Sequence, residues 1–504
     1  MVRGLTRLQA SGNTPALHVQ TGQDGHMEQE THFLDLFFNP RSVAIVGASD
    51  NRVKPSFMLM NNMVRAGFTG RLYPVNPTAE TVAGVKAYPD LDSIPETVDL
   101  VISAVSPGAT LEVVRRCAAT GIRRVVVVSG GFSDSNDEGR RLEAELAALV
   151  LEKGLYLVGP NTLSPVNTRN RLIVSFNPAE IARPGGASFI FQSGFYDARL
   201  SWICERIGAN KVLDTGNKMA VTETDALEYM ARDPSTRIIG LHLESLRGDA
   251  RRFFQLLGET ARRKPVVILK SGRTAAGARA AASHTGSMAL ENDVIFHDAI
   301  RQAGAVWSET AEDFFDVIKA FSFLEPLSGD RLAVITQSGG EGVLTTDACE
   351  LNGLRMAELS PAGREALAGA MPNWEVPANP FDYGLSVQFH LSDLPRFFGC
   401  MRSISADENV DATLMAIPPG LLGFMHDRPD SRKSADRRNL ETLAEMLAGL
   451  KSPGKPFVMW QSNRDAAEDE TIRMLESRGI PVFDSSFRAI RALAAMSAYF
   501  KRFS

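Results

Sequence analysis

The chain has 504 residues, of which 44% are hydrophobic and 22% charged, and its formal net charge is −5. A chain of this length and composition holds roughly three domains, each with a core of its own. The weak negative charge excludes a surface built for nucleic acid or for an anionic membrane, and no apolar run is long enough to span a bilayer.

Two features of the sequence concern localisation. The first 32 residues have little apolar pattern and lack the apolar core of a secretory signal, so a disordered leader is expected over residues 1–32, with Met27 as an alternative start. The cysteines stand far apart, without the spacing of a metal site: Cys117, Cys204, Cys349 and Cys400. They indicate reduced thiols in a cytoplasmic protein that holds no metal of its own.

Apolar strand patterns alternate with helix patterns from Phe37 onward. Strands are predicted at 42–47, 72–75, 99–105, 124–128 and 155–158, and helices at 58–66, 111–119 and 137–151. Strands that are apolar on both faces and joined through helices indicate a parallel sheet covered on both sides. Residues 33–170 are therefore predicted to form a Rossmann-like α/β domain.

In such a sheet, ligands bind at the carboxyl ends of the strands. The candidate binding residues at these ends are Gly47, Ala48, Ser49, Asn76, Pro77, Ser106 and Asn161. The turn at Gly47 lacks the Gly-x-Gly-x-x-Gly pattern, and the second strand ends in Val75-Asn76-Pro77 instead of an acidic residue. Both points argue against an NAD-dependent dehydrogenase, while a sheet that binds no nucleotide stays an equal alternative.

Two further α/β domains are predicted over residues 180–325 and 328–504. Both open with a strand, a Gln-Ser-Gly turn and a helix, at Gln192-Ser193-Gly194 and at Gln337-Ser338-Gly339-Gly340. Because the first amides of a helix attract anions, Ser193, Gly194, Gly339 and Gly340 predict a pair of phosphate-binding turns. A lone turn of this kind is more often a simple joint between a strand and a helix.

One histidine stands in a run of small residues, Ser283-His284-Thr285-Gly286-Ser287. Small residues pack an imidazole poorly, so a mobile loop is expected here, with His284 accessible to reactants. This setting suits a nucleophile that moves between two partners. A solvated loop histidine without chemistry is the alternative.

The order of these motifs resembles that of the NDP-forming acyl-CoA synthetases, which include the ADP-forming acetate–CoA ligases and are related to succinyl-CoA synthetase. The resemblance covers the chain from about residue 33 to its end. It rests on 37–49, Gly159-Pro160-Asn161, Gln192-Ser193-Gly194, Gly216-Asn217-Lys218, Lys270-Ser271-Gly272-Arg273, Ser283-His284-Thr285-Gly286, 339–344 and Asn379-Pro380-Phe381-Asp382. It implies a Rossmann-like CoA-binding domain followed by two flavodoxin-like, doubly wound ligase domains.

The resemblance also implies the chemistry. A carboxylic acid is activated as an acyl phosphate, coenzyme A displaces the phosphate to give the acyl-CoA, and a histidine carries the phosphoryl group between the acyl phosphate and ADP or ATP, reversibly. His284 matches that histidine, and Glu244 matches the carboxylate that holds its ring. The residues named at the strand ends of the first domain would bind coenzyme A. ATP or ADP and Mg would bind to a partner β subunit with the ATP-grasp fold, which makes a hetero-oligomer.

Some residues depart from the family pattern. Phe195-Tyr196-Asp197 follows the first turn where small residues are usual, and Glu341 follows the second, where a carboxylate repels phosphate unless it points away. These departures leave the acid open, and the sequence does not distinguish ADP from GDP. They also keep an alternative in place: a non-catalytic regulatory or scaffold protein that binds CoA or acyl-CoA.

Overall fold

The computed structural model describes residues 31–181, 183–285, 293–369, 371, 378–384, 394–417, 435–461 and 466–503. Residues 33–504 form one compact unit. The expected disordered leader lies outside the described residues except for Thr31 and His32.

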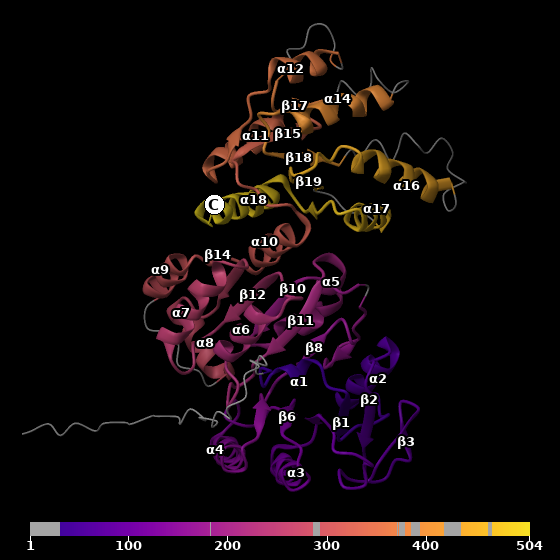
Figure 1. Cartoon of the computed structure of the whole chain (residues 1–504), viewed down its shortest axis with the longest axis vertical. Coiled ribbons are helices and arrows are strands. Elements are labelled where there is room, and N and C mark those ends of the chain that lie inside the picture. The colour runs from indigo at the N-terminus through magenta and orange to yellow at the C-terminus, as the bar shows by residue number, and fades with distance from the viewer. Residues whose placement is uncertain are drawn as a thin grey trace, which may run out of the picture. The chain divides into compact units, whose positions relative to one another are not determined.

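The first sheet has five parallel strands in the order β2-β1-β5-β6-β7. Its strands are β1 (Ser42–Val46), β2 (Arg71–Val75), β5 (Leu100–Ser103), β6 (Arg124–Val127) and β7 (Tyr156–Val158). Val43, Ala44 and Ile45 are fully buried, as expected for a central strand covered on both faces. The connecting helices are α2 (Ser56–Ala66), α3 (Pro107–Ala119) and α4 (Asp137–Lys153). Figure 1 shows α3 and α4 side by side, and the Arg115–Glu145 ion pair joins them.

Helix α4 shows how local sequence sets the limits of an element. The Asn136 side chain accepts a hydrogen bond from the Gly139 amide at 2.9 Å, and two acidic residues occupy the first turn. Gly154 ends the helix in the left-handed conformation, at φ +61°. The N-cap at Asn136 and the glycine at 154 therefore set the two ends of the helix that the sequence predicts.

The second sheet has the strand order β14-β13-β12-β10-β11-β8-β9. Its parallel part consists of β10 (Ala187–Phe191), β11 (Ala209–Asp214), β12 (Ile238–Leu243), β13 (Val266–Lys270) and β14 (Val306–Ser308). The short strands β8 (Val166–Asn167) and β9 (Leu172–Ile173) add to one edge, and β8 runs antiparallel to β11. Strand β8 falls within the range 33–170 and yet pairs into this sheet.

The helices of this region follow the same alternation. They are η1 (Gly194–Arg199, a 3-10 helix), α5 (Leu200–Arg206), α6 (Glu223–Arg232), α7 (Ala250–Ala261), α8 (Ala275–Thr285), α9 (Asp293–Ala303) and α10 (Ala311–Phe323). Helices η1 and α5 connect β10 to β11, α6 connects β11 to β12, α7 connects β12 to β13, and α8 and α9 lie between β13 and β14, as in a doubly wound fold. Helix α10 follows β14 and leads to the third sheet.

The third sheet has the order β16-β15-β18-β19-β20, and β17 also pairs with β15. Its strands are β15 (Arg331–Thr336), β16 (Arg355–Met356), β17 (Phe381–Asp382), β18 (Ala412–Ala416), β19 (Phe457–Trp460) and β20 (Val482–Phe483). The described helices are α11 (Gly339–Leu351), α12 (Pro361–Ala368), α14 (Leu394–Ala406), α16 (Ala435–Ala448), α17 (Ala466–Ser477) and α18 (Ser486–Phe503). Three sheets rich in parallel strands confirm the predicted α/β fold class.

A buried ionic triad joins α5, α10 and α17. Glu476 lies 2.7 Å from the Arg206 guanidinium and 2.5 Å from the Lys319 ammonium group. All three side chains are at least nine-tenths buried, and Lys319 also donates to the Val482 carbonyl at 2.6 Å. Since a buried charge is costly without its partner, this triad fixes the packing of α17 against α5 and α10.

In the part of the chain that the structure describes, no helix is long and apolar enough to cross a membrane.

Candidate functional site

A cavity of about 620 Å³ lies at the carboxyl ends of the first sheet. Three of the candidate residues from the sequence line this cavity: Gly47 after β1, Ser106 after β5 and Asn161 after β7. Lys54 and Ser56 lie on the wall formed by the start of α2, and Phe176 adds an aromatic side chain. The cavity is therefore where a parallel sheet places its ligand.

Gly47 is required by the shape of this cavity wall. Its φ is +88°, and a Cβ atom there would stand 2.9 Å from both the Ala104 carbonyl oxygen and Val105 Cγ1. Its amide donates to the Val75 carbonyl at 3.0 Å, which ties the turn to β2. A residue with a side chain would strain the backbone and displace the neighbouring loop at once.

Two helix N-termini face the cavity. Pro55 is the N-cap of α2, and Ser106 is the N-cap of α3 in extended conformation. The first amides of a helix carry partial positive charge, and the exposed Lys54 adds a full one. The cavity therefore suits phosphate groups.

The other strand-end candidates are not among the cavity's lining residues. Asn76 donates to the Ala48 carbonyl at 2.8 Å, and its carbonyl oxygen accepts from the Thr78 and Ala79 amides at 3.0 Å. Ser49 Oγ accepts from the Asn51 amide at 3.1 Å. Ala48 is fully buried and Pro77 is exposed. Asn76 and Ser49 thus build turns with their side chains, and their contact with a ligand stays a prediction.

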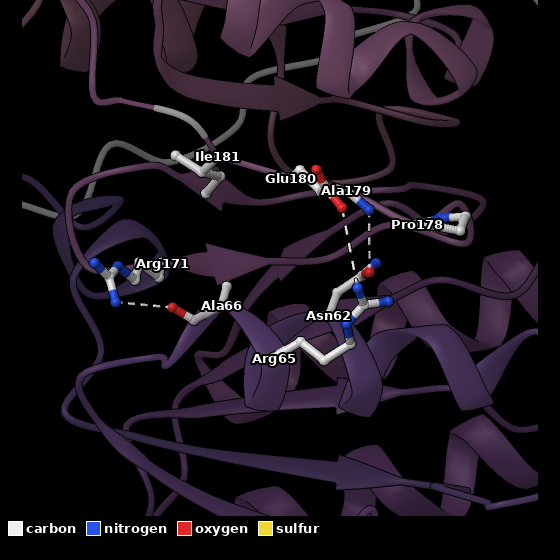
Figure 2. A pocket seen from close by; sticks show the side chains of 8 residues that line it. All are labelled: Asn62, Arg65, Ala66, Arg171, Pro178, Ala179, Glu180 and Ile181. Carbon is white, nitrogen blue, oxygen red and sulfur yellow. Dashed lines mark hydrogen bonds and ion pairs between the residues drawn. The ribbon is translucent and has the colours of Figure 1, made fainter. Parts of the chain in front are cut away.

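A second cavity, of about 330 Å³, lies at the opposite end of α2 (Figure 2). Its polar groups already serve the backbone: Arg171 donates to the Ala66 carbonyl at 3.0 Å, and Asn62 accepts from the Ala179 amide at 3.2 Å. Arg65 faces Glu180 at 4.0 Å across it. These contacts make the cavity a joint between α2 and the segment 178–181.

Glu244 follows β12 and is buried, with 6% of its surface exposed. The Gln192 side chain, from the first Gln-Ser-Gly turn, fixes its backbone. Gln192 Oε1 accepts from the Glu244 amide at 2.7 Å and from the Ser245 amide at 2.9 Å, and Nε2 donates to Ser245 Oγ at 2.9 Å. The turn after β10 therefore positions the carboxylate after β12.

Two buried ammonium groups act on Glu244. Burial lowers the pKa of Lys218, while Glu223 and then Glu244 raise it. Lys218 Nζ lies 2.9 Å from Glu223 Oε2 and donates to the Ser245 carbonyl at 2.6 Å. Burial also lowers the pKa of Lys270, against the opposite effects of Asp293 and Glu244. The carboxylate of Glu244 thus stands in a field set by two cations, one from the loop after β11 and one from the end of β13.

Asp214 closes the end of β11 and is buried. Its carboxylate accepts from the Leu163 and Gly216 amides, each at 3.0 Å. Burial raises the pKa of Asp214 to about 7, and the charges of Asp197 and Glu244 act in the same direction, against the two amide hydrogen bonds. A carboxyl group that titrates near neutrality therefore lies beside the Glu244 region.

The loop that carries Asn161 is held against the loop 214–218. The Asn217 amide donates to the Pro160 carbonyl at 3.0 Å, and its side chain donates to Asp134 at 3.0 Å and to Glu143 at 2.9 Å. A Cβ atom on Gly216 would stand 2.2 Å from the Pro160 carbonyl oxygen. The cavity of the first sheet and the Glu244 region are thus connected through directly packed backbone.

The first predicted phosphate-binding turn differs from expectation. Ser193 and Gly194 begin the 3-10 helix η1, and only the next seven residues form α5, whereas the sequence predicts one continuous helix. The cause is the inward packing of two side chains. Tyr196 stacks on Phe191 with ring centroids 4.5 Å apart and donates to the Leu163 carbonyl, and the buried Asp197 accepts from Asn177 at 2.6 Å.

The second turn begins a full α-helix. Ser338 caps α11, with its hydroxyl accepting from the Glu341 amide at 3.3 Å, and Gly339 and Gly340 are the first helical residues. The Glu341 carboxylate accepts from the Trp460 indole at 2.9 Å. The Glu341 carboxylate, which the sequence places beside a predicted phosphate-binding turn, therefore accepts a hydrogen bond from a buried tryptophan.

His284 lies on α8, near the end of that helix. The expected loop over 283–285 is wrong, because the alanine-rich run before it is helical and Ala has the highest helix propensity. The His284 side chain and residues 286–292 lie outside the described residues. The pairing of His284 with Glu244 therefore stays a prediction.

Sequence reasoning assigned no role to Lys218, Lys270 or Asp214. Two of them carry a visible signal, since Asp214 and Lys270 are charged residues at the last position of an apolar strand. Lys218 belongs to the Gly216-Asn217-Lys218 motif, but its burial depends on the fold of the loop 215–222.

Comparison with known proteins gives the family. Residues 41–167 match the CoA binding domain family, and residues 184–321 match the succinyl-CoA ligase like flavodoxin domain. The chain is 31% identical over 475 residues to the alpha subunit of acetate–CoA ligase [ADP-forming] I of Pyrococcus furiosus, with 93% of this chain and 98% of that one covered. It belongs to the ADP-forming acyl-CoA synthetase family.

Further relatives agree. Acetate–CoA ligase [ADP-forming] II of Archaeoglobus fulgidus is 33% identical, and the alignment covers 93% of this chain and 67% of that protein. The dinucleotide forming acetyl-coenzyme A synthetase 1 of Ca. Korarchaeum cryptofilum, solved with phosphate and ADP, superposes with a TM-score of 0.79 at 28% identity, covering 93% and 98% of the two chains. The resemblance seen in the motifs is confirmed, and this chain is the alpha-type chain of an acid–thiol ligase.

Proposed function

We propose that this chain is the alpha subunit of an NDP-forming acyl-CoA synthetase, which makes an acyl-CoA from a carboxylic acid, coenzyme A and ATP, reversibly. The single observation that carries the proposal is the linkage of two sites. The Gly47–Ser106–Asn161 cavity, with two helix N-termini, is joined through the packed loops 159–163 and 214–218 to the region of Glu244. Such a ligase needs both sites, one for the thiol substrate and one for phosphoryl transfer.

In the proposed reaction, the first cavity binds the phosphate groups of coenzyme A through the amides at the starts of α2 and α3 and through Lys54. In the direction of acyl-CoA synthesis, a neutral ring nitrogen of His284 takes up the γ-phosphoryl group of ATP and ADP is released, while Glu244 accepts a hydrogen bond from the other ring N–H and fixes the tautomer. His284 passes the phosphoryl group to the carboxylate of the acid, which gives the acyl phosphate. The thiol then attacks its carbonyl carbon and releases inorganic phosphate. The phosphoryl oxygens would bind to the two Gln-Ser-Gly turns, at Ser193, Gly194, Gly339 and Gly340.

The nucleotide half of the reaction is assigned to a partner. The alignment covers 67% of the length of the Archaeoglobus protein and 98% of the Pyrococcus alpha subunit. We therefore assign ATP or ADP, with Mg, to a β subunit with the ATP-grasp fold. The isolated chain is expected to lack net ligase activity and to gain it when that subunit is added.

The experiment is co-expression with a candidate β subunit, followed by a screen of carboxylic acids with CoA and ATP. Incubation of the complex with labelled ATP is expected to give an acid-labile, base-stable label on His284, weaker as the pH falls below about 6.5. His284→Ala should abolish both label and turnover. Acid-stable label on Ser283 or Thr285, or full activity in His284→Ala, would refute the mechanism. CoA binding without any label would favour the regulatory or scaffold alternative.

A further inference from the structure

A cavity of about 420 Å³, separate from the residues assigned above, lies between α9, β14 and the end of α18. Its polar lining consists of His297, Arg301, Trp307, Tyr499 and Arg502, and small or aliphatic residues form the remainder. No acidic residue is among the described residues that line it. Its volume is in the range of small-molecule sites.

The two arginines are differently held. Arg502 donates to the carbonyls of Arg301 and Gln302 at 2.6 and 2.8 Å, so it caps the carboxyl end of α9. A guanidinium has five N–H groups, and these bonds use two of them. Arg301 lines the same cavity and is exposed to solvent. Two arginines therefore line one cavity. The nearest carboxylates are those of Glu309, 3.1 Å from the Trp307 indole nitrogen, and Asp298, 3.2 Å from His297 Nδ1, and neither of these residues is among those that line the cavity.

The aromatic wall is fixed in place. Trp307 meets His297 edge to face, with ring centroids 4.9 Å apart, and its indole donates to Glu309 at 3.1 Å. The Tyr499 hydroxyl donates to the Ala261 carbonyl at 2.8 Å. Since these rings are already oriented, a ligand pays little for ordering them.

We infer that this cavity binds a small phosphorylated compound. Arginine pairs with phosphate oxygens through parallel N–H groups, and the net positive lining favours a dianion over a neutral metabolite. Trp307 and Tyr499 supply an apolar surface for the organic part of the molecule.

A residue that lines the cavity, Trp307, also contacts the segment just before the helix that carries His284. The Arg273 guanidinium lies 5.0 Å from the Trp307 ring centroid and 3.0 Å from Asp293, the first residue of α9. Arg273 stands two residues before α8 begins. Resting on the proposed function, this contact links the bound compound through Trp307 and Arg273 to the start of α8, and we expect the compound to act as an effector that changes the rate of His284 phosphorylation.

The test uses the full chain, with inorganic phosphate and AMP as probes. Binding of each probe is measured by calorimetry and by tryptophan fluorescence. Arg301→Glu is expected to weaken binding at least 10-fold, and Trp307→Phe to remove the fluorescence change while binding is kept. Arg251→Glu, an exposed arginine on α7, is the matched control and should leave affinity unchanged. Tighter binding of AMP than of phosphate would assign the organic part to the aromatic wall, and equal affinity would assign recognition to the phosphate alone.

Undiminished binding in Arg301→Glu, or no binding of either probe, would overturn the site. In the complete complex, the probe should change the labelling rate of His284 in the wild type and not in Arg301→Glu. The same change in both proteins would overturn the effector role. A complex that binds the probe but never labels His284 would leave this site standing and refute the proposed function.

Discussion

Asp214 gives the strongest quantitative prediction, because its burial opposes its charge. The pKa of Asp214 rises from the ordinary 3.8 to about 7. At about 1.4 kcal/mol for each tenfold change in proton affinity, the protonated side chain stabilises the folded state by about 4 kcal/mol relative to the ionised one. The folded chain binds this proton more tightly than the unfolded chain does. The stabilisation is therefore fully present below pH 4 and is lost as the pH rises through about 7.

Asp214→Asn removes this titration, since the amide is neutral at every pH. The advantage of the wild type over Asp214→Asn in free energy of unfolding should therefore be larger at pH 4.5 than at pH 8, by about 3 kcal/mol, because the unfolded carboxyl group is already mostly ionised at pH 4.5. Urea titrations of both proteins across this range, followed by tryptophan fluorescence, measure the difference. Asp137→Asn, at a side chain that is 89% exposed, is the control and should show a flat difference. Parallel pH profiles for wild type and Asp214→Asn would show that burial does not control this carboxyl group.

Three further substitutions test other parts of the structure. Gly47→Ala should weaken CoA binding about 10-fold or more in calorimetry, from backbone strain of about 1–3 kcal/mol and contacts at 2.9 Å, whereas Gly121→Ala, at φ +80° with open space around it, should not. Glu476→Gln should lower the free energy of unfolding by about 3–5 kcal/mol in urea, because it leaves Arg206 and Lys319 buried without their carboxylate. An effect below 1 kcal/mol would mean that the triad is solvated. Glu244→Gln should slow His284 labelling by about 10²–10⁴-fold with CoA affinity unchanged, and equal loss of both would indicate a damaged fold.

The cavity of the first sheet illustrates what a sequence can predict. Gly47, Ser106 and Asn161 are far apart in the chain, yet each follows an apolar strand, and the carboxyl ends of parallel strands meet at one edge. The pattern therefore brings them together without knowledge of any contact. Asn76 follows the same rule and still does not line the cavity, because its carboxamide is engaged by Ala48 and by the amides of its own turn.

Contacts distant in sequence explain what the pattern missed. The pairing of β8 with β11 joins residues more than 40 positions apart, and the two-residue strands carry too short a pattern to be recognised. The 3-10 helix after Ser193 likewise depends on Leu163, which accepts from the Tyr196 hydroxyl, and on Asn177, which donates to Asp197. Local propensity cannot anticipate partners that only the folded chain supplies.

The departures from the family pattern have different consequences once their partners are known. A glutamate in the first turn of α11 stabilises that helix by about 0.3–1 kcal/mol but opposes an anion at the same N-terminus. The Trp460 indole holds the Glu341 carboxylate in place, and Tyr196 and Asp197 are buried against Phe191 and Asn177. Phe195 differs, because it stays partly exposed with its ring centroid 4.8 Å from that of His242, two residues before Glu244. Phosphate binding at both turns stays a prediction, and Phe195 is the departure that we expect to act on the choice of acid.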